Sequence, residues 1–231
     1  MSLLDRLDIR IAEIRVGRLF IGVTVAMFQL VVYQLMLQYN AQRLASVESW
    51  QVETTLDQMV PLIPEFAFVY FLYIPGLIIP ALLDMPMRLF VRYALALVVA
   101  VCVSSLCFAL VPLRIDHEEY TCAEMACMGL SLLRDVDPGI NLLPSLHASQ
   151  TLLAALVLFT AANVHGVRSF WWFWSLVLYI PIIFSTLATK QHFVIDLVAG
   201  FCVAICVWVV SGIVSSRWVR TDMEKVSGRA G

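Results

Sequence analysis

Six apolar stretches, each close to the length of a membrane-spanning helix, dominate this sequence. They cover residues 17–37, 66–83, 89–111, 145–164, 170–187 and 193–214. A helix needs about 20 apolar residues to cross the hydrocarbon core of a bilayer. Six such helices leave room for only modest loops, so the sequence predicts an all-α, polytopic membrane protein with six transmembrane helices. Pro75 and Pro80 are expected to kink the second helix.

The composition excludes several other classes of protein. Apolar residues make up 61% of the chain and charged residues 14%, whereas a soluble domain has about 45–50% and about 25%. A disordered or collagen-like chain is therefore excluded. The formal net charge of −2 provides no basic surface for DNA or RNA, so we expect no nucleic-acid partner.

Basic residues predict the orientation in the membrane. Eleven of the fifteen Lys and Arg residues fall on one side of the six predicted spans, and the other four are Arg43, Arg114, Arg134 and Lys190. Cytoplasmic loops carry an excess of Lys and Arg, so both termini are predicted to be cytoplasmic. The opposite face, which is periplasmic, extracellular or lumenal, holds the acidic loops and the residues with catalytic potential.

We expect one six-helix domain over residues 17–215. Residues 1–16 place Leu4, Leu7 and Ile11 on one helical face, which predicts an amphipathic segment on the membrane surface. Residues 216–231 are expected to form a cytoplasmic tail. No cleavable signal peptide is expected, because no small-residue cleavage site follows a short apolar core.

The long outer loop over residues 112–143 contains two of the six cysteines. Residues 118–133 are expected to form a short helix at the membrane surface. Cys122 and Cys127 would form a disulfide in an oxidising compartment, but five residues of separation along one helix is poor geometry for a bridge. The other four cysteines lie in spans and are expected to be packing residues.

The first polar segment with catalytic potential is residues 141–149. Pro144 and Ser145 are typical of a helix start, where Ser145 can serve as N-cap. Free backbone N–H groups at a helix start suit an anion such as phosphate. His147 falls in that first turn. The alternative for a lone histidine here is a water-bonded interfacial side chain.

The second polar segment is residues 185–196. His192 and Asp196 are four residues apart, so we expect them to share one face of a helix. Asp196 can then fix the tautomer of His192 and leave the other ring nitrogen free as a nucleophile. A purely structural His–Asp pair is the alternative, because a carboxylate one turn inside an apolar helix needs a partner.

Together, the two segments predict phosphoryl transfer. His192 attacks phosphorus and His147 acts as the general acid. Phosphoryl oxygens can be held by Ser145, Thr186, Thr189, Lys190 and helix N-terminal amides. We expect no metal ion and no other cofactor, because side chains supply the positive charge and no CxxC or HExxH spacing is present.

These residues resemble the type 2 phosphatidic acid phosphatase superfamily. Residues 144–147 (PSLH) are similar to its PSGH-type motif, and residues 185–196 are similar to its SRxxxxxHxxxD motif. The likeness is closer to the inositolphosphorylceramide-synthase-like branch, which shows PSLH and the pattern T-x-Q-H-(Y/F)-x-x-D-x-x-A-G. Residues 189–200 read TKQHFVIDLVAG. The resemblance covers residues 20–215 and implies a six-helix fold.

The resemblance implies that His192 is the nucleophile, Asp196 orients it, His147 is the general acid and Ser145 binds phosphate. Two departures concern the phosphate clamp. Thr186 stands where the family motif has an arginine, and no Arg-Pro dipeptide represents the upstream KxxxxxxRP motif. Lys190 is a candidate for the first missing charge. Arg114 is the best positional substitute for the second and Arg134 the next, although either can instead pair with the acidic loop.

The expected substrate is a lipid phosphate, because a site at a helix end receives a head group while the tails stay in the bilayer. Phosphatidate, polyprenyl phosphate or diphosphate, and a phospholipid head-group donor all fit. The enzyme is a hydrolase if water accepts the phosphoryl group and a transferase if a lipid alcohol accepts it. The rival hypotheses are a transporter that uses His192 and Asp196 as a proton relay, and a non-catalytic scaffold with a decayed site.

Overall fold

The computed structural model describes residues 3–44, 50, 52–83, 85–117, 119–165 and 168–227, and these residues form helices and connections without a strand. The helices are α1 (Leu3–Leu44), α2 (Thr55–Met59), α3 (Phe66–Tyr70), α4 (Tyr73–Leu82), α5 (Met87–Leu110), α6 (Glu124–Val136), α7 (Leu146–His165), α8 (Arg168–Ala188) and α9 (Val194–Ser227). The all-α prediction is confirmed for this part of the chain.

Within the described part of the chain, three helical segments are long and apolar enough to cross a membrane. They are Arg15–Leu44, Met87–Leu110 and Val194–Val214. Shorter apolar helical segments, Phe66–Leu82, Leu146–Ala162 and Ser175–Ala188, coincide with the other three predicted spans. Large apolar side chains such as Phe20, Leu35 and Val198 are exposed on the outside of the bundle. Such a surface suits lipid rather than water, so the fold is that of a membrane protein.

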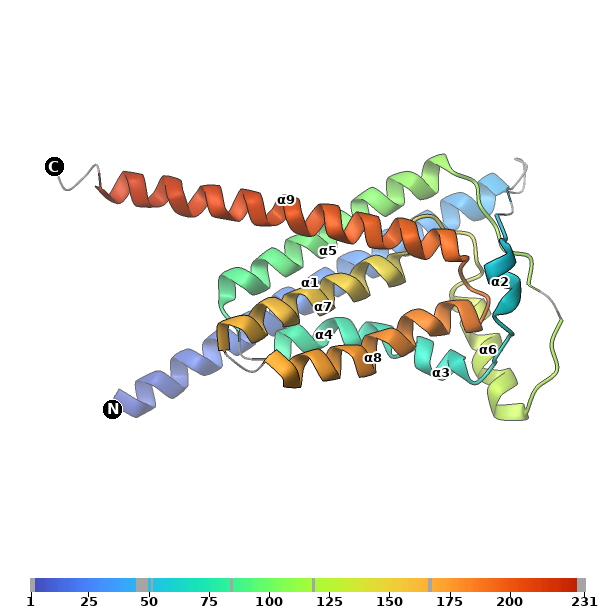
Figure 1. The fold of residues 1–231 in the computed structure, drawn as a ribbon, viewed down its shortest axis with the longest axis horizontal. Helices are drawn as coiled ribbons and strands as arrows, with labels where there is room; N and C mark the ends of the chain where they lie inside the picture. The colour runs from blue at the N-terminus through green and yellow to red at the C-terminus, as the bar shows by residue number, and fades with distance from the viewer. Residues whose placement is uncertain are drawn as a thin grey trace.

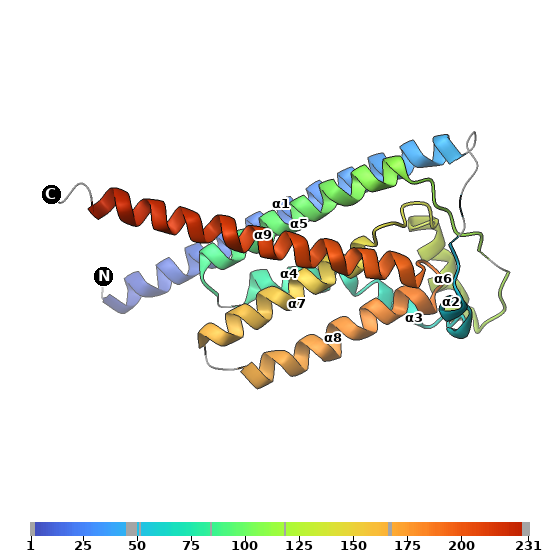
Figure 2. The same cartoon turned by 45° about the horizontal axis from the view of Figure 1, so that its top comes forward.

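Helix α7 lies at the centre of the bundle. It contacts α4, α5, α8 and α9, and both views show it running between α8 and the pair α5 and α9 (Figures 1 and 2). Ala148, Ala154 and Ala162 on α7 are buried. Small residues let neighbouring helices approach closely, which is how helices pack in lipid.

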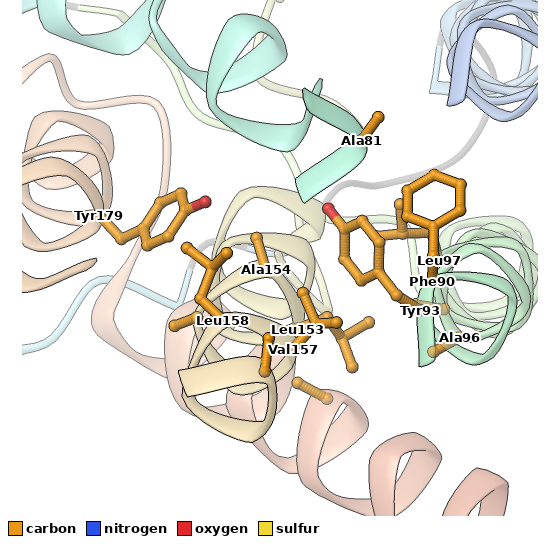
Figure 3. Close-up of a cluster of buried hydrophobic side chains, with 14 of the residues drawn as sticks. Ala81, Phe90, Tyr93, Ala96, Leu97, Leu153, Ala154, Val157, Leu158 and Tyr179 are labelled. Carbon is orange, nitrogen blue, oxygen red and sulfur yellow. The ribbon is translucent and has the colours of Figure 1, made fainter. Parts of the chain in front are cut away.

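The main core cluster joins α7 to its neighbours through interlocking apolar side chains (Figure 3). Leu153, Val157 and Leu158 of α7 are almost fully buried. The same cluster contains Phe90 and Tyr93 of α5 and Tyr179 of α8, and Figure 3 shows Leu158 on the side of Tyr179. In a bilayer this cluster stabilises the bundle mainly by van der Waals packing, because lipid tails are as apolar as the core.

The second predicted span is interrupted one turn before Pro75. Helix α3 ends at Tyr70 and α4 begins at Tyr73, with a turn at residues 71–72. Pro75 has no N–H for the carbonyl of Phe71 and its ring clashes with that carbonyl, which breaks the helix there. Pro80 lies inside α4. The break places Tyr70 and Tyr73 near His147 from two directions.

The two ends of the bundle differ. The start of α1 and the end of α9 project at one end, whereas α2, α3 and α6 gather at the other (Figures 1 and 2). Helix α1 continues without interruption through residue 16, and α9 extends to Ser227 into the predicted tail. The membrane-surface position of residues 1–16 and the tail's cytoplasmic location remain predictions.

The outer loop contains the expected short helix, but this helix begins six residues later than predicted, at Glu124. Cys122 therefore lies just before the helix and Cys127 in its first turns, and the two form a disulfide with Cα atoms 5.5 Å apart. The expectation of poor bridging geometry was wrong, because it assumed that both cysteines lie on the helix.

Candidate active site

The first turn of α7 carries His147 and is tied to the first turn of α9. The Ser145 amide N–H donates to the carbonyl O of Asp196 (3.0 Å), and the Ser145 hydroxyl oxygen accepts from the Ala148 amide N–H (3.3 Å). Ser145 therefore caps α7. A Cβ at Gly200 would stand 2.5 Å from the carbonyl O of Ser145. Only glycine lets α9 approach the cap this closely.

His192 lies in the connection between α8 and α9, just before α9 begins at Val194. The expectation that His192 and Asp196 share a helical face was wrong. The Asp196 carboxylate accepts the amide N–H of Phe193 at 2.9 Å and so caps the helix after His192. The two side chains still meet, because Nδ1 of His192 lies 3.5 Å from Oδ2 of Asp196.

The two histidine rings face each other between α7 and α9. Nδ1 of His147 lies 3.3 Å from Nε2 of His192, and the ring centroids are 5.4 Å apart. Both residues are buried, and Asp196 is fully buried. Because Asp196 lies beside Nδ1 of His192, Nε2 is the nitrogen left for a reacting group. The structure thus brings together all three residues predicted to be catalytic.

A carboxylate and tyrosines that sequence reasoning did not assign to the site complete this cluster. The hydroxyls of Tyr33 (2.6 Å) and Tyr70 donate to the carboxylate of Asp137. The Tyr70 oxygen also lies 3.4 Å from Nδ1 of His147. The rings of Tyr70 and Tyr73 pack against His147, with centroids 4.4 and 4.2 Å away. The only available signal was tyrosine within apolar stretches, which is too common to identify a site.

A cavity of about 440 Å³ opens beside His192 at the end of the bundle that carries α2 and α6. A lipid head group fits a pocket of this size. Its ionisable lining comprises the basic or imidazole side chains of His117, Arg134, Lys190 and His192 and the acidic side chains of Glu53, Asp57 and Asp116. The pocket wall therefore offers charges of both signs.

Lys190 lies on this wall in a left-handed turn with φ 56°. Its Nζ donates to the backbone carbonyl O of Asp57 (2.7 Å). The carboxylate of Asp57 accepts the Val194 amide N–H (2.7 Å) and so caps α9. Lys190 and Asp57 together fix the connection that carries His192, and the ammonium remains at the pocket wall.

The two candidate arginines have different positions. Arg134 lines the pocket, and its guanidinium lies 4.5 Å from the Tyr120 ring centroid. The Arg114 side chain is 51% exposed and pairs with Asp116 at 2.9 Å. Arg114 is not among the described residues that line the pocket. Arg134, which was the second candidate, therefore lies at the pocket, whereas Arg114, the first candidate, lies in the acidic loop.

The three predicted hydroxyl ligands are fully buried inside the bundle rather than on the pocket wall. The Thr186 and Thr189 hydroxyls donate to the α8 carbonyls of Ile183 (2.8 Å) and Ser185 (2.7 Å). The carbonyl of Thr186 accepts the amide N–H groups of Gln191 and His192. In this arrangement Thr186, Thr189 and Ser145 hold the backbone around the histidines.

His117 is a further pocket residue that the sequence did not identify. Burial is the main cause that lowers the pKa of His117 to about 4, and the positive charge of Arg134 acts in the same direction. Gly139, with φ +70°, leaves space beside its ring, because a Cβ there would stand 3.3 Å from Nε2 of His117. His117 therefore presents a neutral imidazole to the pocket near pH 7.

Side chains with metal-binding atoms also meet in the cluster, since one atom each from Asp137, His147 and His192 lie within 4.8 Å of one another. The Asp137 carboxylate already accepts two tyrosine hydroxyls, and the Tyr70 oxygen lies between it and His147. We assign no metal ion to this group.

Comparison with family models, curated proteins and solved structures gives no match to this chain. The resemblance to a phosphatase superfamily therefore rests on the two motifs and their spacing.

Proposed function

We propose that this protein is an integral membrane enzyme that transfers a phosphoryl group from a lipid phosphate through a phosphohistidine intermediate. It acts as a lipid phosphatase or a head-group phosphotransferase. The observation that carries the proposal is the buried pair His147 and His192, 3.3 Å apart, with Asp196 behind His192 and a head-group-sized pocket beside it. The motif resemblance to type 2 phosphatidic acid phosphatases supports the same chemistry.

In the first step, Nε2 of His192 attacks phosphorus while the P–O bond to the leaving oxygen breaks. Asp196, 3.5 Å from Nδ1, stabilises the positive charge that develops on the ring. His147 gives a proton to the leaving oxygen, which departs as an alcohol or a phosphate. The substrate phosphoryl group enters between the two rings, which separate to admit it.

In the second step, the oxygen of water or of a lipid alcohol attacks phosphorus and the P–N bond breaks. His147, now neutral, takes the proton of the incoming oxygen. Water makes the enzyme a phosphatase, and a lipid alcohol makes it a transferase. The head-group phosphate lies near Lys190 and Arg134, and the α7 N-terminus adds partial positive charge. The mechanism requires no metal ion.

We further propose six membrane crossings, by α1, α3 with α4, α5, α7, α8 and α9. Both termini are cytoplasmic and the pocket faces the periplasm, the extracellular space or a lumen. The distribution of Lys and Arg supports this orientation. The Cys122–Cys127 disulfide at the pocket end supports it independently, because disulfides persist in oxidising compartments. Substrate tails then stay in the outer leaflet while the head group enters the pocket.

The test is a product assay on the purified protein in detergent micelles. Phosphatidate, a polyprenyl phosphate, a polyprenyl diphosphate and a phospholipid donor are each supplied with and without diacylglycerol or another lipid alcohol. Free phosphate and labelled lipid are followed together. Phosphate release without an acceptor identifies a phosphatase, and a new phospholipid that requires the acceptor identifies a transferase. A folded sample that forms neither product contradicts the proposal.

Two reagents, EDTA and vanadate, test whether the reaction follows the proposed mechanism. EDTA is expected to leave the rate unchanged. Vanadate is expected to inhibit, because it mimics five-coordinate phosphorus. Loss of turnover on chelation would contradict the metal-independent mechanism.

A further inference from the structure

A second carboxylate, that of Asp137, lies near His147 on the side of Nδ1, the ring nitrogen that also faces His192. Asp137 is 7% exposed and terminates α6, where its amide N–H donates to the carbonyl of Leu133 (2.8 Å). Helices α6 and α3 pack as a unit, since Leu130 and Leu133 share one buried cluster with Tyr70. This packing holds the Asp137 carboxylate and the Tyr70 hydroxyl together beside His147.

The donors and acceptors in this group fix the direction of its hydrogen bonds. Tyr70 has one hydroxyl proton, and it donates that proton to Asp137. Its oxygen can then only accept at its other contact, which is Nδ1 of His147 at 3.4 Å. Tyr33 donates to the other oxygen of Asp137 at 2.6 Å. The Tyr70 oxygen therefore has a hydrogen-bond donor at this contact only when Nδ1 of His147 carries a proton.

Aromatic rings and polar side chains surround His147. The rings of Tyr70 and Tyr73 pack against the imidazole. An oxygen of the Asp137 carboxyl group lies within 4.8 Å of a ring nitrogen of His147. Opposite lies Nε2 of His192 at 3.3 Å, which offers a lone pair. Asp196 contacts the far nitrogen of His192.

We propose that Tyr70 and Asp137 are positioning residues for the general acid. They keep a proton on Nδ1 of His147, which the leaving oxygen takes once the substrate is bound, and this inference rests on the proposed function. As the P–O bond breaks, the proton passes from Nδ1 to the leaving oxygen and the imidazolium becomes neutral imidazole. In the second step, the proton of water or of the lipid alcohol returns to Nδ1.

The first test compares two leaving groups in micelles. Dodecyl phosphate releases an alkoxide-like oxygen that needs a proton, whereas p-nitrophenyl phosphate releases a stable phenolate that does not. We expect Asp137→Asn to lower kcat/KM for dodecyl phosphate by about 100-fold, the scale of general-acid assistance. Tyr70→Phe should lower it by about 10-fold or more. Both variants should lose less than about threefold on p-nitrophenyl phosphate.

Tyr73→Phe is the matched control. It keeps an aromatic ring against His147 and removes a hydroxyl that donates to Oε1 of Gln150 at 2.6 Å rather than to Asp137. It should change turnover of the two substrates by the same factor. An equal loss on both substrates in Asp137→Asn and Tyr70→Phe would assign these residues to structure alone and overturn the proposal.

The second test does not depend on turnover. The chain has four histidines, so ¹⁵N spectra of histidine-labelled protein can be assigned by the signals lost in His147→Gln. We expect a protonated Nδ1 on His147 in the wild type and loss of that proton in Tyr70→Phe and Asp137→Asn. An unprotonated Nδ1 in the wild type, or no change in the variants, overturns the inference. A wild type with the expected spectrum but without turnover on any lipid phosphate would instead overturn the proposed function.

Discussion

The histidine cluster and the pocket wall beside it are built differently. The histidines, Asp137, Asp196, Tyr70 and Tyr73 of the cluster are buried and Tyr33 is half-buried, and the cluster draws on α1, α3, α4, α6, α7 and α9. The pocket wall consists largely of connections between helices, and its charges have partners of their own, such as the Asp57 carbonyl for Lys190. In the proposed enzyme, the reacting groups therefore lie in or beside the helices of the bundle and the groups that bind the substrate lie mainly on loops, as in many enzymes.

The largest effect should come from the cluster. We expect His192→Ala to abolish phosphoryl transfer, with a loss of roughly 1,000-fold or more in kcat, because no P–N bond can form. Asp196→Asn should lower kcat strongly while the protein still folds. Phosphate release from a lipid phosphate is the measurement.

His165→Ala, at the opposite end of α7, is the matched control and should retain the wild-type rate. Unchanged turnover in His192→Ala would contradict the proposed mechanism.

The next largest effect should come from the close backbone contact between the start of α7 and α9. Gly200→Ala introduces a Cβ 2.5 Å from the carbonyl O of Ser145, which forces α9 away from the cap of α7. We expect a loss of about 1–3 kcal/mol in unfolding free energy and a lower kcat, measured by melting in micelles and by turnover. Gly17→Ala is the control, because a Cβ there meets nothing within 4 Å. Similar melting temperatures for the two variants would contradict the close contact.

A smaller effect should distinguish the two arginines of the outer loop. Arg134 lines the pocket and Arg114 pairs with Asp116. Arg134→Ala should raise KM for a lipid phosphate by about 10-fold, the scale of one charge-assisted hydrogen bond. Arg114→Ala should change KM by less than about twofold, because exposed ion pairs contribute little. The reverse order would show that the loop closes differently over the substrate.

The smallest effect is a pH dependence of stability at the pocket wall. The pKa of His117 falls from its ordinary 6.5 to about 4 on folding. Between these values the unfolded chain binds a proton that the folded chain does not, so stability declines as pH falls from 6.5 towards 4. In His117→Gln, the melting temperature should decline less over this range. Parallel declines in the variant and the wild type would exclude this contribution.

Several features of the fold and of the candidate site are predicted correctly from the sequence. Long apolar runs predicted the helices, since Met87–Leu110 and Leu146–His165 match two expected spans to within two residues. The motif spacing led to His147, His192 and Asp196, which the structure brings together. These features can be predicted because they depend on residues that are close together in the sequence. The helices follow from local hydropathy, and each motif lies within a short segment.

Other features depend on contacts between distant segments, which no local pattern reveals. Tyr33 and Asp137 are 104 residues apart and Tyr70 and Asp137 are 67 apart, yet they meet through the packing of α1, α3 and α6. The choice between Arg114 and Arg134 also depended on the path of the loop. The start of α6 at Glu124, six residues beyond the predicted one, places Cys122 before the helix, and the cap by Asp196 leaves His192 outside α9.

The most direct test of the central claim is a search for the covalent intermediate. The protein is mixed with a ³²P-labelled lipid phosphate, quenched within milliseconds under alkaline conditions, digested and mapped by mass spectrometry. The account predicts an acid-labile, base-stable phosphoryl group on His192, absent in His192→Ala. Turnover without a labelled histidine, or a label on His147 instead, would contradict it.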